Sequence, residues 1–135
     1  MKNLAKHDKI AVDVDDTLLG NSPGKHILWD FISANKNNKI FYLVTFRIKP
    51  CIDEVFDDLF SETSVVAKDH FAGLVGIPPK VFFGEDLQTP LVEWKGLTAF
   101  KLGCTLLIDD LPDLVLPGCR KYGVDYLHPR DLTYG

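Results

Sequence analysis

Two groups of aspartates, far apart in the sequence, each follow directly on a short apolar run. Asp13 and Asp15 follow the first run, and Asp109 and Asp110 follow the second. Such runs are typical of buried strands, and parallel α/β sheets carry their chemistry beyond the carboxyl ends of the strands. Carboxylates gathered there repel one another and are costly to bury unpaired. A hard divalent cation removes both costs, so the pattern predicts a shared Mg²⁺ site.

A hydroxyl and a guanidinium come at the end of another apolar run, residues 40–45. Thr45 is the last residue of that run, and its hydroxyl would face the same crevice as Asp13. Threonine is also a common strand residue, so Thr45 has a purely structural explanation as well. Arg47 follows closely and could hold a phosphate through two parallel hydrogen bonds, although a solvated loop arginine is an equally simple interpretation.

The apolar spacing predicts the elements that would position these side chains. Strands are expected over residues 10–12, 40–45, 81–83, 104–108 and 124–127. Helices are expected over residues 22–34, 49–60, 64–74 and 89–102, and Pro117-Gly118 is expected to interrupt any long helix before the last strand. This alternation predicts an α/β fold: a three-layer, doubly wound, Rossmann-like and mostly parallel sheet. The gaps between elements leave room for no cap or a minimal one.

Composition narrows the class of protein. The 135 residues are expected to form one domain, 1–135, with 46% hydrophobic and 25% charged residues and a net charge of −4. This balance gives no general basic surface for nucleic acid. Three cysteines (Cys51, Cys104 and Cys119) have no metal-binding spacing and favour reduced thiols. The first residues lack a signal-peptide pattern and no run is long enough to span a membrane, so a cytoplasmic protein with no membrane partner is expected.

The order of the motifs resembles the haloacid dehalogenase (HAD) superfamily over nearly the whole chain. Asp13-x-Asp15-x-Thr-Leu-Leu is similar to its first motif, Thr45 to its second, and Asp109-Asp110 to its fourth. The resemblance implies that Asp13 is a nucleophile, Asp15 a general acid and base, and Thr45 a ligand for a phosphoryl oxygen. It also implies Mg²⁺ held by Asp13, by the backbone carbonyl of Asp15 and by Asp110, with Asp109 beside them.

The third motif of that superfamily is a lysine in or before the helix leading to the last acidic strand. Lys95 is the best match, and Lys101 and Lys80 are the alternatives. An ammonium group is needed there because nucleophile and phosphate are both anionic.

The resemblance implies an enzyme, a small capless HAD-like hydrolase. It would be a Mg²⁺-dependent phosphatase that hydrolyses a phosphomonoester through an aspartyl phosphate. Its phosphorylated substrate could be a small molecule or a macromolecule, including nucleotides and polynucleotide 3′-phosphates, and capless members often form homo-oligomers. The alternative is a non-catalytic metal- and phosphate-binding regulatory domain of the same fold. A response-regulator receiver fits less well, because its phosphorylated aspartate ends a middle strand.

Overall fold

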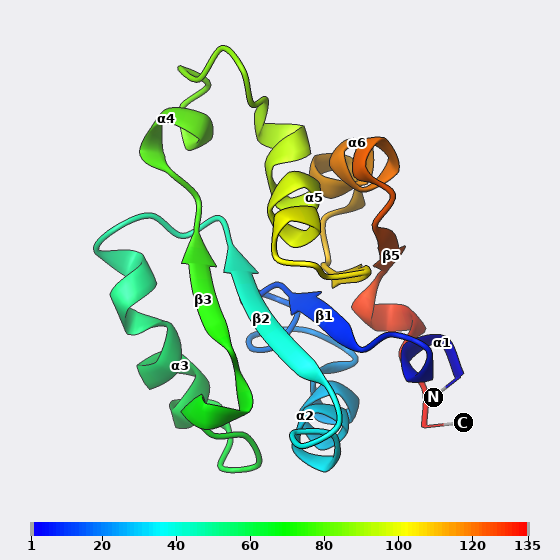
Figure 1. Ribbon diagram of the computed structural model, residues 1–135. Helices are drawn as coiled ribbons and strands as arrows, with labels where there is room; N and C mark the ends of the chain where they lie inside the picture. The colour runs from blue at the N-terminus through cyan, green and yellow to red at the C-terminus, as the bar shows by residue number, and fades with distance from the viewer. Residues whose placement is uncertain (1, 135) are drawn as a thin grey trace.

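The computed structural model describes residues 2–134 and shows a five-stranded sheet with helices on both faces (Figure 1). The strands are β1 (Lys9–Val12), β2 (Ile40–Thr45), β3 (Gly73–Gly76), β4 (Leu106–Ile108) and β5 (Asp125–Leu127). All four pairings are parallel and the strand order is β3-β2-β1-β4-β5. The predicted fold class, a three-layer doubly wound α/β sheet, is confirmed.

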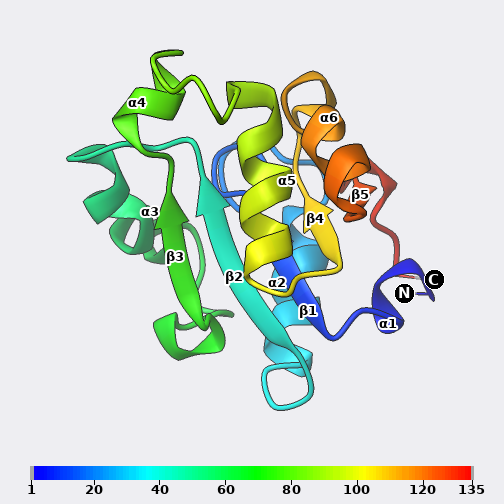
Figure 2. The same cartoon turned by 45° about the horizontal axis from the view of Figure 1, so that its top comes forward.

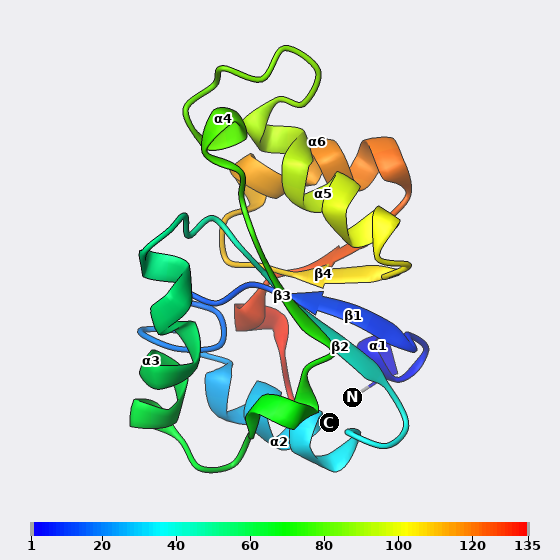
Figure 3. The same ribbon diagram turned by 60° about the vertical axis from the view of Figure 1, so that its left-hand side comes forward.

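The helices divide into two layers. In Figure 3, α2 (Lys25–Ala34) and α3 (Val55–Glu62) lie on one side of the sheet. On the other side lie α4 (Pro79–Phe82), α5 (Leu91–Lys101) and α6 (Pro112–Tyr122). Helix α1 (Lys2–Ala5) precedes β1, and short 3₁₀ turns occupy η1 (Cys51–Glu54), η2 (Lys68–His70) and η3 (Pro129–Asp131).

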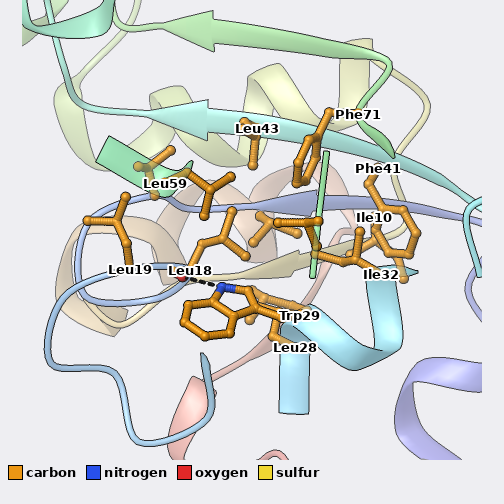
Figure 4. Packing of buried hydrophobic residues seen from close by; sticks show 14 of the residues in the cluster. Ile10, Leu18, Leu19, Leu28, Trp29, Ile32, Phe41, Leu43, Leu59 and Phe71 are labelled. Atoms are coloured by element: carbon orange, nitrogen blue, oxygen red, sulfur yellow. Dashed lines mark hydrogen bonds between the residues drawn. The ribbon is translucent and has the colours of Figure 1, made fainter. Parts of the chain in front are cut away.

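The central strands are apolar on both faces because both faces are covered. Along β1, Ile10 and Val12 point into the α2–α3 layer, while Ala11 points into the α5–α6 layer. This alternation follows from the two-residue period of a strand, and strands buried on both sides have nearly continuous apolar sequences. In the first layer, the Trp29 indole donates a hydrogen bond to the Leu18 carbonyl at 2.7 Å (Figure 4). That bond ties the loop after β1 to α2.

The third strand differs from its predicted position. No strand forms over residues 81–83, where one was expected: residues 81 and 82 lie in α4, which begins at Pro79, and Phe83 caps its C-terminus. The true strand, β3, begins at the end of the helix expected over residues 64–74 and runs past it, and it pairs with β2 from Tyr42↔Gly73 to Thr45↔Gly76. A Cβ on Gly76 would lie 2.8 Å from the Arg47 carbonyl oxygen and 2.2 Å from the Ile52 side chain. The close packing of Ile52 in η1 therefore requires a glycine at position 76. The same glycine weakened the apolar sequence pattern from which a strand would be predicted.

Two further predictions about helices need correction. Pro117 does not interrupt the C-terminal helix but lies inside α6. The helix continues to Tyr122, and Gly123 follows it in the left-handed conformation. The helix loses one backbone hydrogen bond at Pro117. The second prediction, one helix over residues 49–60, is replaced by η1 followed by α3.

Helices α5 and α6 lie side by side at very short range (Figure 2). A Cβ on Gly96 would lie 2.2 Å from the carbonyl carbon of Gly118, and a Cβ on Gly118 would lie 2.5 Å from the Glu93 carbonyl oxygen. The two backbones therefore touch where neither residue has a side chain.

The three cysteines are all unpaired thiols, as expected. Cys51 is exposed at the start of η1, whereas Cys104 and Cys119 are buried in the α5–α6 layer. Burial raises the pKa of each buried thiol to about 11. No helix within residues 2–134 has the length and apolarity needed to cross a membrane.

Candidate metal centre

The carboxyl ends of β1 and β4 bring the two acidic segments together. Val12 pairs with Ile108, so Asp13 and Asp109 are the next residue on each strand. The backbone continues the sheet beyond the strands, since the amide of Asp13 donates to the Ile108 carbonyl at 2.9 Å and the amide of Asp109 to Leu127 at 3.2 Å. The positions of these two aspartates are therefore set by the register of the sheet.

Three carboxylates converge at this edge. One oxygen from each of Asp13, Asp109 and Asp110 lies within 4.8 Å of the other two. Asp13 is 5% exposed, Asp109 is fully buried, and Asp110 is half-buried. Mg²⁺ binds oxygen ligands at about 2.1 Å, so ligand oxygens around one ion lie roughly 3 to 4 Å apart. The donor set and its spacing fit a small hard cation after minor side-chain movement.

Lys95 enters the cluster from α5 and is fully buried. Its Nζ donates to Asp13 Oδ1 at 2.7 Å and to Asp109 Oδ2, and it lies 4.2 Å from the centre of the Phe46 ring. Burial alone would lower the pKa of this lysine, but the charges of the two carboxylates outweigh burial and raise it. The two alternatives, Lys80 and Lys101, are exposed side chains.

The cluster holds more negative than positive charge. Burial, followed by repulsion from Asp13, raises the pKa of Asp109 to about 6 despite its contact with Lys95. Burial, followed by a hydrogen bond with Asp13 and by its charge, raises the pKa of Asp110 to about 7. One ammonium group therefore does not neutralise three carboxylates, and a bound cation would.

The hydrogen bonds separate direct ligands from supporting groups. Both oxygens of Asp109 are engaged, Oδ2 by Lys95 and Oδ1 by the Leu111 amide at 2.9 Å. Asp13 Oδ2 and Asp110 Oδ1 contact no lysine among residues 2–134, and the Thr17 hydroxyl lies 3.0 Å from the first and 3.4 Å from the second. Asp13 and Asp110 are therefore the better placed pair for direct contact with a cation, and Asp109 holds Lys95.

Two supporting residues were not singled out by the sequence. The buried Thr17 hydroxyl donates to Asp13 Oδ2 at 3.0 Å and lies 3.4 Å from Asp110 Oδ1. The Tyr126 hydroxyl donates to the backbone carbonyl of Asp109 at 2.6 Å. Thr17 had a signal, because it lies four residues after Asp13 in the acidic motif. Tyr126 had none, because its partner is a backbone atom on a neighbouring strand.

Asp15 and Arg47 do not join the carboxylate cluster with their side chains. Arg47 donates from Nε to Asp15 Oδ2 at 3.0 Å and from one terminal nitrogen to Asp15 Oδ1 at 2.8 Å, and its other terminal nitrogen donates to Asp58 at 2.8 Å. The hydrogen bond with Asp15 is the main reason that the pKa of Arg47 is raised. The predicted phosphate-binding guanidinium is thus already held by two carboxylates.

Thr45 lies at the same edge as the carboxylates. The pairing of β1 with β2 places Leu43 beside Val12, and Thr45 follows two residues later. Its side chain is buried, and its Oγ1 accepts a hydrogen bond from the Arg47 amide at 3.1 Å. Among residues 2–134 the hydroxyl donates to no acceptor, which leaves its proton for a ligand at this edge.

Comparison with known proteins gives little beyond the fold. No family model matches the chain, and no curated protein matches it. Among solved structures, a protein of the universal stress protein family from Burkholderia pseudomallei is 14% identical, with 92% of this chain and 96% of that chain covered and a TM-score of 0.48. A universal stress protein in complex with cAMP is 16% identical, with 90% and 95% covered and a TM-score of 0.48.

No comparison supports the expected membership of the HAD superfamily, and that assignment is withdrawn. The two solved structures belong to a different family of doubly wound proteins. The predicted enzyme, a HAD-like phosphomonoester phosphatase, rested on that resemblance and is corrected with it. The strand order of the sheet is not evidence for a phosphatase either, because doubly wound sheets occur in proteins with unrelated functions.

Proposed function

We propose that this protein binds a divalent cation, Mg²⁺ by preference, at the carboxyl ends of β1 and β4. The convergence of Asp13, Asp109 and Asp110 around the buried Lys95 is the observation that supports the proposal. Side-chain oxygens of Asp13 and Asp110 and the backbone carbonyl of Asp15 are the proposed direct ligands. Asp109 acts through Lys95, and oxygen donors of this kind select a hard cation.

The bound cation would in turn hold a phosphate-bearing ligand. Mg²⁺ held by one or two carboxylates usually keeps other coordination positions for water and phosphate oxygens. Thr45 supplies a hydroxyl at the same edge, and Lys95 supplies a buried positive charge in contact with Asp13 and Asp109. The proposed function is therefore binding, and the ligands share a phosphate group whose oxygen contacts the cation.

The first test is calorimetric titration of the metal-free full chain with MgCl₂. We expect one saturable site, and Asp110→Asn should weaken binding by roughly a hundredfold because it removes a direct ligand. Asp57→Asn is the matched control, since Asp57 is an exposed aspartate on α3, away from the cluster. Absence of saturable binding by the unmodified chain, or equal binding by Asp110→Asn, would overturn the proposal.

The phosphate step is tested separately with inorganic phosphate as the probe. Phosphate should bind measurably tighter in the presence of saturating Mg²⁺ than in its absence. Thr45→Val keeps the shape of the side chain and should weaken phosphate binding while leaving the Mg²⁺ affinity unchanged. If Mg²⁺ has no effect on phosphate binding, the cation site stands without the anion site.

A further inference from the structure

A second hollow lies at the open edge of the sheet, away from the acidic cluster. It has a volume of about 510 Å³ and is lined by apolar side chains of β3, η1 and α3 with two lysines at its rim. Strand β3 is the edge strand and pairs with β2 alone among the described strands (Figure 1). The lining includes Phe71 and Leu74 at the amino end of β3, whereas the cluster lies at the carboxyl ends of β1 and β4.

The wall of this hollow is aromatic and firmly held. The Phe56 and Phe71 ring centres are 6.2 Å apart with an angle of 48° between the rings. Phe71 is buried and packs in the α2–α3 core layer (Figure 4). Because one wall belongs to the core, the apolar surface is already formed before any ligand arrives, which is typical of small-molecule sites of roughly 300–1,000 Å³.

The rim carries a positive charge. Lys68 lies 5.4 Å from the centre of the Phe56 ring and forms no ion pair within residues 2–134. Lys49, the second lysine, forms an exposed ion pair with Asp53, with 3.5 Å between Nζ and Oδ1. Two ammonium groups against one carboxylate leave a net positive charge beside an aromatic surface.

We propose that this hollow binds a small amphipathic anion, with an aromatic or otherwise apolar body and a single acidic group. The body lies against Phe56 and Phe71, and the acidic group pairs with Lys68. The site is separate from the cation site, so ligand binding there does not depend on Mg²⁺.

The test uses two fluorescent probes that share an aromatic body and differ in charge. They are 8-anilinonaphthalene-1-sulfonate, an anion, and N-phenyl-1-naphthylamine, which is neutral. The folded full chain should bind the anion at one saturable site, with amide chemical-shift changes in the 71–74 segment. Lys68→Glu should weaken binding of the anion by roughly fivefold and leave the neutral probe unchanged.

Two further variants complete the design. Lys36→Glu changes an exposed lysine between α2 and β2 and should alter neither probe. Ala72→Trp places a bulky side chain at an exposed position that lines the hollow and should weaken both probes. Circular dichroism confirms that each variant is folded. Equal binding of the anion by the unmodified chain and Lys68→Glu, or shift changes elsewhere, would overturn the proposal.

Discussion

Lys95 is a fully buried ammonium group whose charge is balanced by two carboxylates. Replacing it with methionine would leave Asp13 and Asp109 facing each other without compensation. Breaking a buried ion pair from one side is strongly destabilising, because the remaining charge stays buried. We therefore expect Lys95→Met to lower the free energy of unfolding of the metal-free protein by about 3 to 5 kcal/mol.

Urea denaturation measures this effect directly. Lys101→Met is the control, since Lys101 is an exposed lysine at the end of the same helix. If both variants unfold at the same urea concentration as the unmodified protein, the buried ion pairs contribute nothing to stability.

The raised pKa values of Asp109 and Asp110 predict how stability depends on pH. Their pKa values are about 6 and about 7 in the folded metal-free protein, against 3.8 for an ordinary aspartate. Between these values the folded chain binds more protons than the unfolded chain, so these groups make the protein less stable as the pH rises from 4 to about 7. Mg²⁺ competes with those protons and should stabilise the protein more at higher pH.

Thermal unfolding at pH 5.5 and pH 8, with and without MgCl₂, checks this expectation. The increase in Tm caused by MgCl₂ should be larger at pH 8. In Asp110→Asn the increase in Tm caused by MgCl₂ should differ less between pH 5.5 and pH 8. A larger Mg²⁺ effect at pH 5.5 would contradict the assignment.

Tyr126 is expected to position the metal centre through the backbone. Its hydroxyl donates to the carbonyl between Asp109 and Asp110, so it fixes the peptide that carries the Asp110 ligand. We expect Tyr126→Phe to weaken Mg²⁺ binding by about tenfold, as the loss of an indirect support does. The Tm of metal-free Tyr126→Phe should stay close to the Tm of the metal-free unmodified protein.

Tyr42→Phe is the matched control for this variant. Tyr42 is a half-buried tyrosine on β2 whose hydroxyl has no hydrogen-bond partner among the described side chains. Calorimetric titration with MgCl₂ should separate the two variants. Equal Mg²⁺ affinities in both would show that the Tyr126 hydroxyl has only a structural role.

The sequence predicted those site residues whose positions depend on strand ends. Asp13, Asp109 and Asp110 each follow an apolar run, and Lys95 was chosen by its place before the last acidic strand. The engagement of Arg47 by Asp15 and Asp58 was not predictable, because it depends on how η1 and α3 fold back toward β1. Contacts between segments that are distant in sequence leave no local pattern.

At the scale of elements, β3 shows why a strand that contains glycines is hard to predict from the sequence. Gly73 and Gly76 bound the strand, and the two residues between them are too few for a period to appear. Val81 and Phe82 offered a better apolar run, but Pro78 and Pro79 before them begin a helix instead. Strand assignment here was decided by pairing with β2, which is a tertiary effect.

The contact between α5 and α6 links stability to the metal centre. Gly96→Ala would place a Cβ against the backbone of Gly118, where no flexible side chain can move aside. We expect it to lower the free energy of unfolding by about 2 kcal/mol, as overpacking does. Because Gly96 follows Lys95 on α5, the same variant should also weaken Mg²⁺ binding.

Chemical denaturation and titration with MgCl₂ measure the two effects in one variant. Thr98→Ala, a partly exposed position on the same helix, is the control and should show neither effect. An unchanged unfolding free energy in Gly96→Ala would mean that the two helices can separate at little cost.

At the scale of the whole molecule, the strand order explains why two distant segments share one site. The chain moves outward from β1 to β2 and β3, then returns to the other side of β1 to form β4 and β5. Neighbouring strands whose connections leave in opposite directions form a crevice at their carboxyl ends. Asp13 and Asp109 follow these two strands, so the topology alone brings them together.

The unequal exposure of the three thiols has a practical consequence for studying this protein in solution. Cys51 is accessible, while Cys104 and Cys119 are both shielded and held in their unreactive protonated form at neutral pH. A maleimide dye should therefore attach at one place on the native chain without any engineered cysteine. Since Cys51 begins the turn whose next residue lines the hollow beside β3, the attached dye would report events there.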